Sequence, residues 1–320
     1  MKISFIVTVY NEEKTVCALL DSVFKQTKMP DEIVIVDGGS SDQTVAKIKN
    51  DSSRLRSNNN RLHIKLIVKQ GNRAVGRNEA IRNATGDIIV CSDAGCILDK
   101  DWIKYITEPF KDKKIDVVAG YYKGAADNVF QKCLVPYVLV MEDKVDPGNF
   151  LPASRSMAFR KYIWEKANGF PENLSHNEDY AFAKKLKRLN ARTVFEKDAI
   201  VYWIPRENIK EAFIMFFRFA YGDIEAGIFR SKVLLLYVRY LTGSGLVISF
   251  FVLRLPLILH SLFIILAFYI VWSILKNFKY VNHWKAIIYL PLLQLTSDVA
   301  VISGAALGLL KRLWDTQQQQ

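Results

Sequence analysis

Two long segments near the C-terminus contain almost no charge, and they constrain the fold of this 320-residue chain more than any other feature. Residues 255–275 contain no Asp, Glu, Lys or Arg, and residues 286–310 contain only Asp298. A helix of either length would cross a hydrocarbon core of about 30 Å. Helices buried in soluble proteins are usually shorter and more often interrupted by charge. We therefore expect transmembrane helices within residues 241–312, with two clear spans and a candidate third, short span near residues 241–253.

Composition excludes several classes of protein. Hydrophobic residues make up 50% of the chain and charged residues 24%, which is too apolar for a disordered protein. The four cysteines form no C-x-x-C pair, so we expect neither a disulfide scaffold nor a structural zinc site. The formal net charge of +12 suits nucleic acid, an anionic membrane or a phosphate-rich substrate. Residues 209–240 interleave phenylalanines with Lys and Arg, a pattern typical of an amphipathic helix at a membrane surface. We therefore expect a lipid bilayer as a partner, and no nucleic acid.

The first 208 residues alternate short apolar runs with helical patterns. Such alternation predicts βαβ units and a parallel sheet with right-handed crossovers. The polar stretch 51–60, rich in Asn and Ser, predicts a loop. The sequence thus predicts an α/β domain over residues 1–208, an interfacial segment over 209–240, an anchor over 241–312 and a tail over 313–320. The expected strands lie at residues 3–9, 33–36, 64–68, 87–92 and 117–121, with further short strands near 157–159 and 193–195.

Acidic residues follow two of these strands. Asp37 comes directly after the second strand and Asp93 after the fourth. Ligands of open α/β sheets collect at the carboxyl ends of the strands, so these carboxylates mark a candidate site. A single Asp at such a place is more often a turn or helix-capping residue. The first strand is followed by Tyr10 and Asn11 and by no glycine-rich loop, which argues against a dinucleotide-binding dehydrogenase and a P-loop kinase.

The motifs at these strand ends resemble those of the inverting family 2 glycosyltransferases. The resemblance is carried in consistent order by residues 5–13, 32–44, 76–81, 93–96, 101–103, 177–180 and 218–223. It implies a GT-A-like domain with a mostly parallel nucleotide-sugar-binding sheet flanked by helices. It also implies transfer of a hexosyl group from a UDP- or GDP-sugar with inversion at the anomeric carbon.

The resemblance assigns residues to the donor. Asp37 is expected to accept a hydrogen bond from the base or ribose, and Asn11 and Glu13 lie on the loop that borders the same pocket. Arg77 is expected to face the diphosphate, because its planar fork of donors suits phosphate oxygens. Asp93 is expected to bind the donor through a divalent cation.

The resemblance also assigns the catalytic groups and the metal. Asp179 is the expected base for the acceptor hydroxyl, with Glu178 beside it as an orienting or competing base. The alternative role for this pair is to stabilise a helix N-terminus. The expected cofactor is Mg²⁺ or Mn²⁺ on Asp93. The family usually has a second Asp two residues later, where this chain has Gly95. Either Asp99 or Asp101 stands in for it, or the metal rests on Asp93, diphosphate oxygens and water.

A membrane anchor on a sugar transferase predicts a membrane-embedded acceptor, either polyprenyl phosphate or a polyprenyl-linked saccharide. Because sugar nucleotides are cytosolic, we expect a multi-pass protein of the cell membrane with its catalytic domain in the cytoplasm. Two other functions stay open: a non-catalytic nucleotide-sugar-binding membrane protein, and a processive polysaccharide synthase. The second is less favoured, because the chain has few clear spans and no Q-x-x-R-W segment.

Overall fold

The computed structural model describes residues 1–58 and 63–318, and the chain divides into two compact units. The first unit comprises Met1–Ala125 and Leu139–Ile204, and the second comprises Ala126–Val138 and Pro205–Gln320. Residues Ala126–Val138 therefore belong to the second unit, although they lie within the range 1–208 that the sequence pattern assigns to a single domain.

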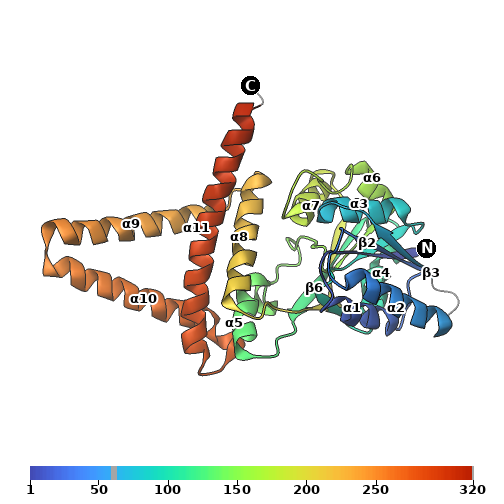
Figure 1. Cartoon of the computed structure of the whole chain (residues 1–320), viewed down its shortest axis with the longest axis horizontal. Helices are drawn as coiled ribbons and strands as arrows, with labels where there is room; N and C mark the ends of the chain where they lie inside the picture. Colours follow the sequence, from blue (N-terminus) through green and yellow to red (C-terminus); the bar gives the residue numbers. More distant parts are fainter. Residues whose placement is uncertain (59–62, 319–320) are drawn as a thin grey trace. The chain divides into compact units, whose positions relative to one another are not determined.

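An eight-stranded mixed sheet forms the centre of the first unit, in the order β3-β2-β1-β4-β7-β6-β8-β5 (Figure 1). The first four strands of this order are mutually parallel, whereas β7 is antiparallel to both of its neighbours. The predicted α/β class is confirmed, and β6 and β8 form a further parallel pair in the second half of the sheet. The strands are β1 (Ile3–Val9), β2 (Glu32–Asp37), β3 (His63–Val68), β4 (Ile88–Cys91), β5 (Cys96–Leu98), β6 (Val117–Gly124), β7 (Met157–Arg160) and β8 (Thr193–Trp203).

Helices flank this sheet. Helix α3 packs closely on β1 at Gly76. This approach requires glycine, since a Cβ added there would lie only 2.8 Å from the Thr8 side chain. The residues before β3 differ from the expected loop: residues 51–58 continue α2, and residues 59–60 lie outside the described residues. The helices are α1 (Val16–Phe24), α2 (Thr44–Asn58), α3 (Arg73–Asn83), α4 (Trp102–Thr107), α6 (Lys161–Lys166) and α7 (Glu178–Arg188), with short 3₁₀ turns at Glu108–Lys111 and Glu142–Lys144.

Aromatic rings pack between the sheet and α7. Phe182 of α7 stacks on Phe170 with ring centroids 4.1 Å apart, and it meets Phe159 of β7 edge-on at 5.6 Å. All three side chains are fully buried. Burial of each such side chain stabilises the fold by about 1.5–3 kcal/mol. This contact anchors α7, and hence the acidic residues at its start, against the sheet.

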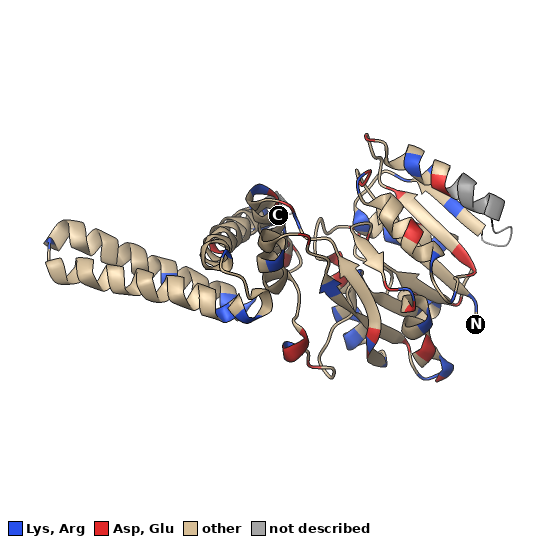
Figure 2. Ribbon diagram, turned by 90° about the horizontal axis from the view of Figure 1, so that it is seen from below, with Lys and Arg blue, Asp and Glu red and all other residues tan. Residues whose placement is uncertain are grey.

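The second unit is helical, and three of its helices are long and apolar enough to cross a membrane: Ser231–Leu253, Pro256–Val281 and Ala286–Trp314. The first begins inside the predicted interfacial segment 209–240, so the candidate third span near residues 241–253 is part of a 23-residue helix. Figure 2 shows few charged residues along the paired helices α9 and α10. The helices of this unit are α5 (Val129–Val138), α8 (Ile209–Glu225), α9 (Ser231–Leu253), α10 (Pro256–Val281) and α11 (Ala286–Gln318).

Candidate functional site

The loops after β1 and β2 are joined by Asn11 and Glu13. The Asn11 side chain accepts a hydrogen bond from the backbone N–H of Ser41 at 2.9 Å, and the Asn11 backbone N–H donates to the Ser40 hydroxyl at 2.8 Å. Glu13 accepts from the backbone N–H of Gln43 at 3.0 Å. Asn11 has a φ of 52°, in the left-handed region that Asn tolerates better than most residues. Both predicted donor residues therefore fix the shape of this edge of the sheet.

Asp37 ends β2 and organises the turn that follows. Its side chain is 1% exposed, and its Oδ2 accepts from the backbone N–H groups of Gly39 and Ser40, both at 2.9 Å. Its Oδ1 accepts from the Ser40 hydroxyl at 2.5 Å. Gly39 has a φ of +96°, a conformation that favours glycine. The contact of Asp37 with a nucleotide stays a prediction.

Arg77 of α3 is a buried link between two other parts of the site. Its Nη1 donates to Glu178 at the start of α7, and its Nη2 donates at 2.9 Å to both Asp93 and Ser154. The guanidinium is 2% exposed and lies 5.6 Å from the centre of the Phe170 ring. Burial alone would lower the pKa of Arg77, but the carboxylates of Glu178 and Asp93 outweigh it and hold that pKa well above its ordinary value.

The arrangement of Arg77 differs from the expectation that it faces a diphosphate. Two carboxylates and a hydroxyl engage its donors, and almost none of its surface is open to a ligand. A buried guanidinium is tolerated when such partners satisfy it. The structure therefore supports a positioning role, in which Arg77 fixes Asp93 and Glu178 relative to each other.

Ser154 lies between the two aspartates of the site. Its hydroxyl is 3.1 Å from Asp93 Oδ1 and 3.2 Å from Asp179 Oδ2, and its backbone N–H donates to Asp179 Oδ2 at 3.2 Å. The hydroxyl has a single proton, so it donates to one carboxylate at a time while accepting from Arg77. The structure thus brings Arg77, Asp93, Glu178 and Asp179 into one cluster. Asn11, Glu13 and Asp37 form a second group on the loops after β1 and β2.

The two aspartates differ in acidity. Burial raises the pKa of Asp179, and the negative charges of Glu178 and Asp93 raise it further. Burial would also raise the pKa of Asp93, but the positive charges of Arg77 and Arg155 outweigh it and lower that pKa below its usual value. Asp93 is therefore the better anionic ligand and Asp179 the better proton acceptor.

Asp93 fits a divalent cation as a single protein ligand. Its side chain is 34% exposed, and among the described residues no hydrogen bond engages its Oδ2. A Cβ added at Gly95 would meet no atom within 4 Å, so the place of the usual second Asp is open space. Asp101 accepts from the Thr27 hydroxyl at 2.6 Å, a contact outside the cluster. Within the described part of the chain, no three His, Cys, Asp or Glu side chains are grouped to hold a metal. Mg²⁺ and Mn²⁺ suit such a site when substrate phosphates complete the coordination.

Arg155 is a cation of this site to which the sequence motifs assign no role of its own. Its guanidinium lies over the rings of Tyr122 and Trp203, at 5.6 and 5.2 Å from their centres. Its carbonyl accepts from the Ser92 hydroxyl at 2.8 Å, but in the described residues its guanidinium makes no hydrogen bond or ion pair. The available signal was a polar and basic run, residues 152–156, immediately before β7, which is equally typical of a plain loop.

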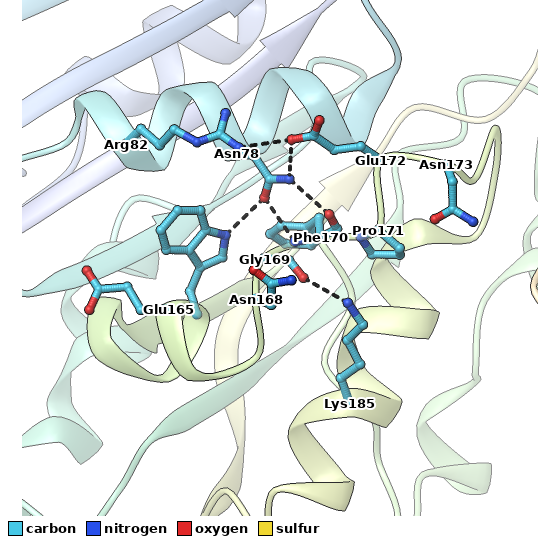
Figure 3. Close-up of a pocket in the computed structure, with 11 residues that line it drawn as sticks. Asn78, Arg82, Glu165, Asn168, Gly169, Phe170, Pro171, Glu172, Asn173 and Lys185 are labelled. Atoms are coloured by element: carbon cyan, nitrogen blue, oxygen red, sulfur yellow. Dashed lines mark hydrogen bonds and ion pairs between the residues drawn. The ribbon is translucent and has the colours of Figure 1, made fainter.

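Asn78, next to Arg77 on α3, fixes the segment that leads to α7 (Figure 3). Its Oδ1 accepts from Trp164 Nε1 at 3.0 Å and from the Phe170 N–H at 2.9 Å. Its Nδ2 donates to the Phe170 carbonyl at 2.9 Å and to Glu172 at 2.7 Å. These residues line a pocket of about 610 Å³ whose lining does not include the site carboxylates. Neighbouring residues of α3 thus hold both the loop before α7 and the first residue of α7.

Residues 4–162 match the family model described as glycosyl transferase family 2. The chain is 26% identical over 230 residues to the O-antigen chain rhamnosyltransferase RfbN of Salmonella typhimurium, an alignment that covers 67% of this chain and 71% of the relative. It is 34% identical over 119 residues to poly-β-1,6-N-acetyl-D-glucosamine synthase of Staphylococcus aureus, covering 37% of this chain and 28% of that relative.

Solved structures show a similar fold. The mannosyltransferase PcManGT from Pyrobaculum calidifontis, solved with GDP-Man and Mn²⁺, matches with a TM-score of 0.65 at 19% identity, covering 98% of this chain and 87% of that one. TarS residues 1–349 from S. aureus, solved with UDP-GlcNAc, matches with a TM-score of 0.51 at 25% identity, covering 72% and 69%. The first match extends over both units of the present chain.

Proposed function

The chain is a member of glycosyl transferase family 2 with a GT-A-like fold, and we propose that it transfers a hexosyl group, with inversion, to a membrane-embedded acceptor. The donor is a nucleotide-diphosphate sugar. The observation that carries the proposal is the pair formed by Asp93 and Asp179, which share Ser154 while differing in acidity.

In the proposed reaction Asp179 is the catalytic base. It takes the proton from the acceptor hydroxyl, and the hydroxyl oxygen forms a bond to the anomeric carbon on the face opposite the diphosphate. The bond between that carbon and the diphosphate oxygen breaks, and the nucleoside diphosphate leaves with the electron pair. The raised pKa of Asp179 suits this role, because a stronger base accepts the proton more readily.

The donor is proposed to lie along the carboxyl ends of the parallel strands. Asp37, with Asn11 and Glu13 bordering the same pocket, contacts the nucleoside. Asp93 faces the diphosphate and would hold a divalent cation, which would neutralise charge on the leaving group. Arg155 supplies a second positive charge to the same phosphates, since its donors are not engaged by the described residues.

The acceptor is proposed to be a polyprenyl-linked saccharide or a polyprenyl phosphate. The three apolar helices support a lipid-linked acceptor, because they would hold the enzyme at the surface where such a lipid resides. A phosphate acceptor is already anionic and needs no base, so Asp179 favours a saccharide hydroxyl. The proposed location is the cell membrane, with the N-terminal unit in the cytoplasm.

A labelling experiment tests the function. Membranes containing the full chain are incubated with a panel of labelled UDP- and GDP-sugars, and the labelled lipid is identified by mass spectrometry. Asp179→Asn should abolish transfer and leave donor binding intact. Asp198→Asn, which alters an exposed carboxylate of β8, should retain full activity. Full transfer activity in the Asp179→Asn variant would show that Asp179 is not the catalytic base.

The same experiment separates the other functions. Donor binding measured by calorimetry without any transfer would indicate a non-catalytic binding protein, a role compatible with Gly95 at the usual metal position. Long labelled polymers instead of a single added sugar would indicate a processive synthase. The configuration of the new linkage relative to the donor, determined by NMR, tests inversion.

A further inference from the structure

The ring of Tyr122, in β6, is packed against three neighbours. It stacks on Tyr121 with ring centroids 5.9 Å apart and planes inclined by 16°, and the Phe150 ring lies 5.8 Å away. The guanidinium of Arg155 lies 5.6 Å from its centre. Aromatic pairs at such distances stabilise a structure beyond the area that they bury. The direction of the Tyr122 side chain is therefore fixed by the contacts of its ring.

The hydroxyl of Tyr122 is open. In the described part of the chain it makes no hydrogen bond, whereas the hydroxyl of the adjacent Tyr121 donates to the carbonyl of Val140 at 2.9 Å. The Tyr122 side chain is half-buried, and its hydroxyl is not among the buried polar atoms that lack a partner. Tyrosine hydroxyls that are buried usually find a hydrogen-bond partner. An open hydroxyl on a ring of fixed direction is therefore available to a ligand.

This hydroxyl lies near the charged groups of the site. Burial raises the pKa of Tyr122, the positive charge of Arg155 lowers it, and the negative charge of Asp179 raises it, with a net rise above the ordinary value. The same segment reaches Asp179 directly: the backbone N–H of Ser154, the residue before Arg155, donates to Asp179 at 3.2 Å. The Tyr122 hydroxyl therefore keeps its proton at neutral pH and stands close to the proposed base.

Further rings extend the apolar side of this place. The Trp203 ring, at the end of β8, has its centre 5.2 Å from the guanidinium of Arg155, and the ring of Phe195 lies 4.6 Å from that of Phe150. Sites for small molecules combine such apolar and aromatic surfaces with a few placed polar groups that fix the orientation of the ligand. A sugar ring offers apolar C–H faces and a rim of hydroxyls, so it matches both parts.

The chemistry of this place favours a sugar over a phosphate. A phenol that keeps its proton is neutral and can both donate to and accept from a sugar hydroxyl. Phosphates are bound most strongly by cations through charge-assisted hydrogen bonds. The cation beside Tyr122 is Arg155, which the proposed function assigns to the donor diphosphate. The nearby carboxylates of Asp93, Glu178 and Asp179 would repel an anionic acceptor.

We propose that Tyr122 binds the acceptor sugar: its hydroxyl forms a hydrogen bond with a second hydroxyl of the sugar whose attacking hydroxyl gives its proton to Asp179. The acceptor is then a saccharide with at least two free hydroxyls, and not a polyprenyl phosphate. This inference rests on the proposed function, in which Asp179 is the base. It adds an acceptor-binding residue to which the sequence motifs assign no role.

Steady-state kinetics of the full chain test this role. The donor is the labelled sugar nucleotide that gives transfer in the panel described above, and the acceptor is a titrated lipid extract of the same membranes. Tyr122→Phe removes the hydroxyl and keeps the ring. Loss of one hydrogen bond between uncharged groups corresponds to about a fivefold effect, so the apparent KM for the extract should rise by about that factor. The kcat, the Kd of the donor in calorimetry and the melting temperature should stay unchanged. The control is Tyr105→Phe, which removes a phenol hydroxyl from α4 and should leave the KM unchanged.

The outcomes separate this inference from the proposed function. An unchanged KM in Tyr122→Phe, in a protein that transfers sugar, would overturn the inference and leave the proposed function standing. A raised KM together with weaker donor binding or a lower melting temperature would show a structural role for the hydroxyl, and would overturn it as well. Transfer to pure polyprenyl phosphate as efficient as transfer to the extract would refute the saccharide acceptor. If the unaltered chain transfers no sugar from any donor, the proposed function fails, and this inference fails with it.

Discussion

Arg77→Met tests whether the buried guanidinium holds the acidic cluster together. Arg77 is 2% exposed and its partner Glu178 is 4% exposed. The substitution keeps an unbranched side chain of similar length and removes the positive charge. Glu178 then remains buried near Asp93 and Asp179 without the charge of Arg77. Removal of one partner from a buried ion pair typically costs about 3–5 kcal/mol, a large part of a domain stability of about 5–15 kcal/mol.

Arg82→Met is the matched control on the same helix. Arg82 is 52% exposed and pairs with Glu79 at 3.5 Å and with Glu172 at 3.1 Å. Exposed ion pairs contribute about 0–1 kcal/mol, so this variant should lose little stability. The double variant Arg77→Met/Glu178→Gln removes the buried negative charge as well. It should be less destabilised than the sum of its two single variants.

The loss of stability in Arg77→Met should depend on pH with a definite sign. Arg77 lowers the pKa of Asp179 in the native protein, so its removal raises that folded-state pKa further above the value in the unfolded chain. A carboxyl with a raised folded-state pKa destabilises the protein above its unfolded pKa, and this cost disappears as the pH falls through the folded value. The deficit should therefore be larger at neutral pH than in mild acid.

Urea unfolding of the detergent-solubilised full chain, followed by tryptophan fluorescence, measures these differences as shifts in midpoint at constant m-value. A deficit for Arg77→Met within about 1 kcal/mol of that for Arg82→Met would refute the proposed burial cost. A deficit that grows as the pH falls would refute the electrostatic explanation.

Three further outcomes are expected. Glu178→Gln should move the acidic limb of the kcat/KM–pH profile to lower pH, because the charge of Glu178 contributes to the raised pKa of Asp179. Asp93→Asn should weaken Mn²⁺ binding in the presence of a nucleoside diphosphate by at least about tenfold in calorimetry, since even residues behind the metal ligands commonly contribute that much. Gly120→Ala should lower the melting temperature, because its Cβ would lie 2.1 Å from a serine hydroxyl and such overpacking costs about 1–3 kcal/mol. Gly95→Ala, where a Cβ meets nothing within 4 Å, should leave the melting temperature unchanged.

The parallel half of the sheet was predictable because its signals are local. Each of β1, β2 and β4 is a short run of apolar residues, and the structure buries nearly all of them. In the second half such runs predicted strands at β6, β7 and β8, but not how these strands pair. β7 pairs antiparallel with β4 although about 70 residues separate them, and no local pattern specifies a partner so distant along the chain. The loop predicted at residues 51–60 failed for a related reason: polar residues can continue a helix whose earlier turns are held by buried side chains such as Ile48.

The acidic residues of the site were identifiable from motifs, but their electrostatic balance was not. That balance depends on α3 meeting α7, which places Arg77 among Asp93, Glu178 and Asp179. One guanidinium among three carboxylates leaves the cluster negative, and a sugar diphosphate is an anion as well. We therefore expect the proposed donor to need additional positive charge in order to bind, from Arg155 and from a divalent cation that the diphosphate would help to hold. We therefore expect the cation and the donor to bind cooperatively, with a single protein carboxylate where the family usually has two.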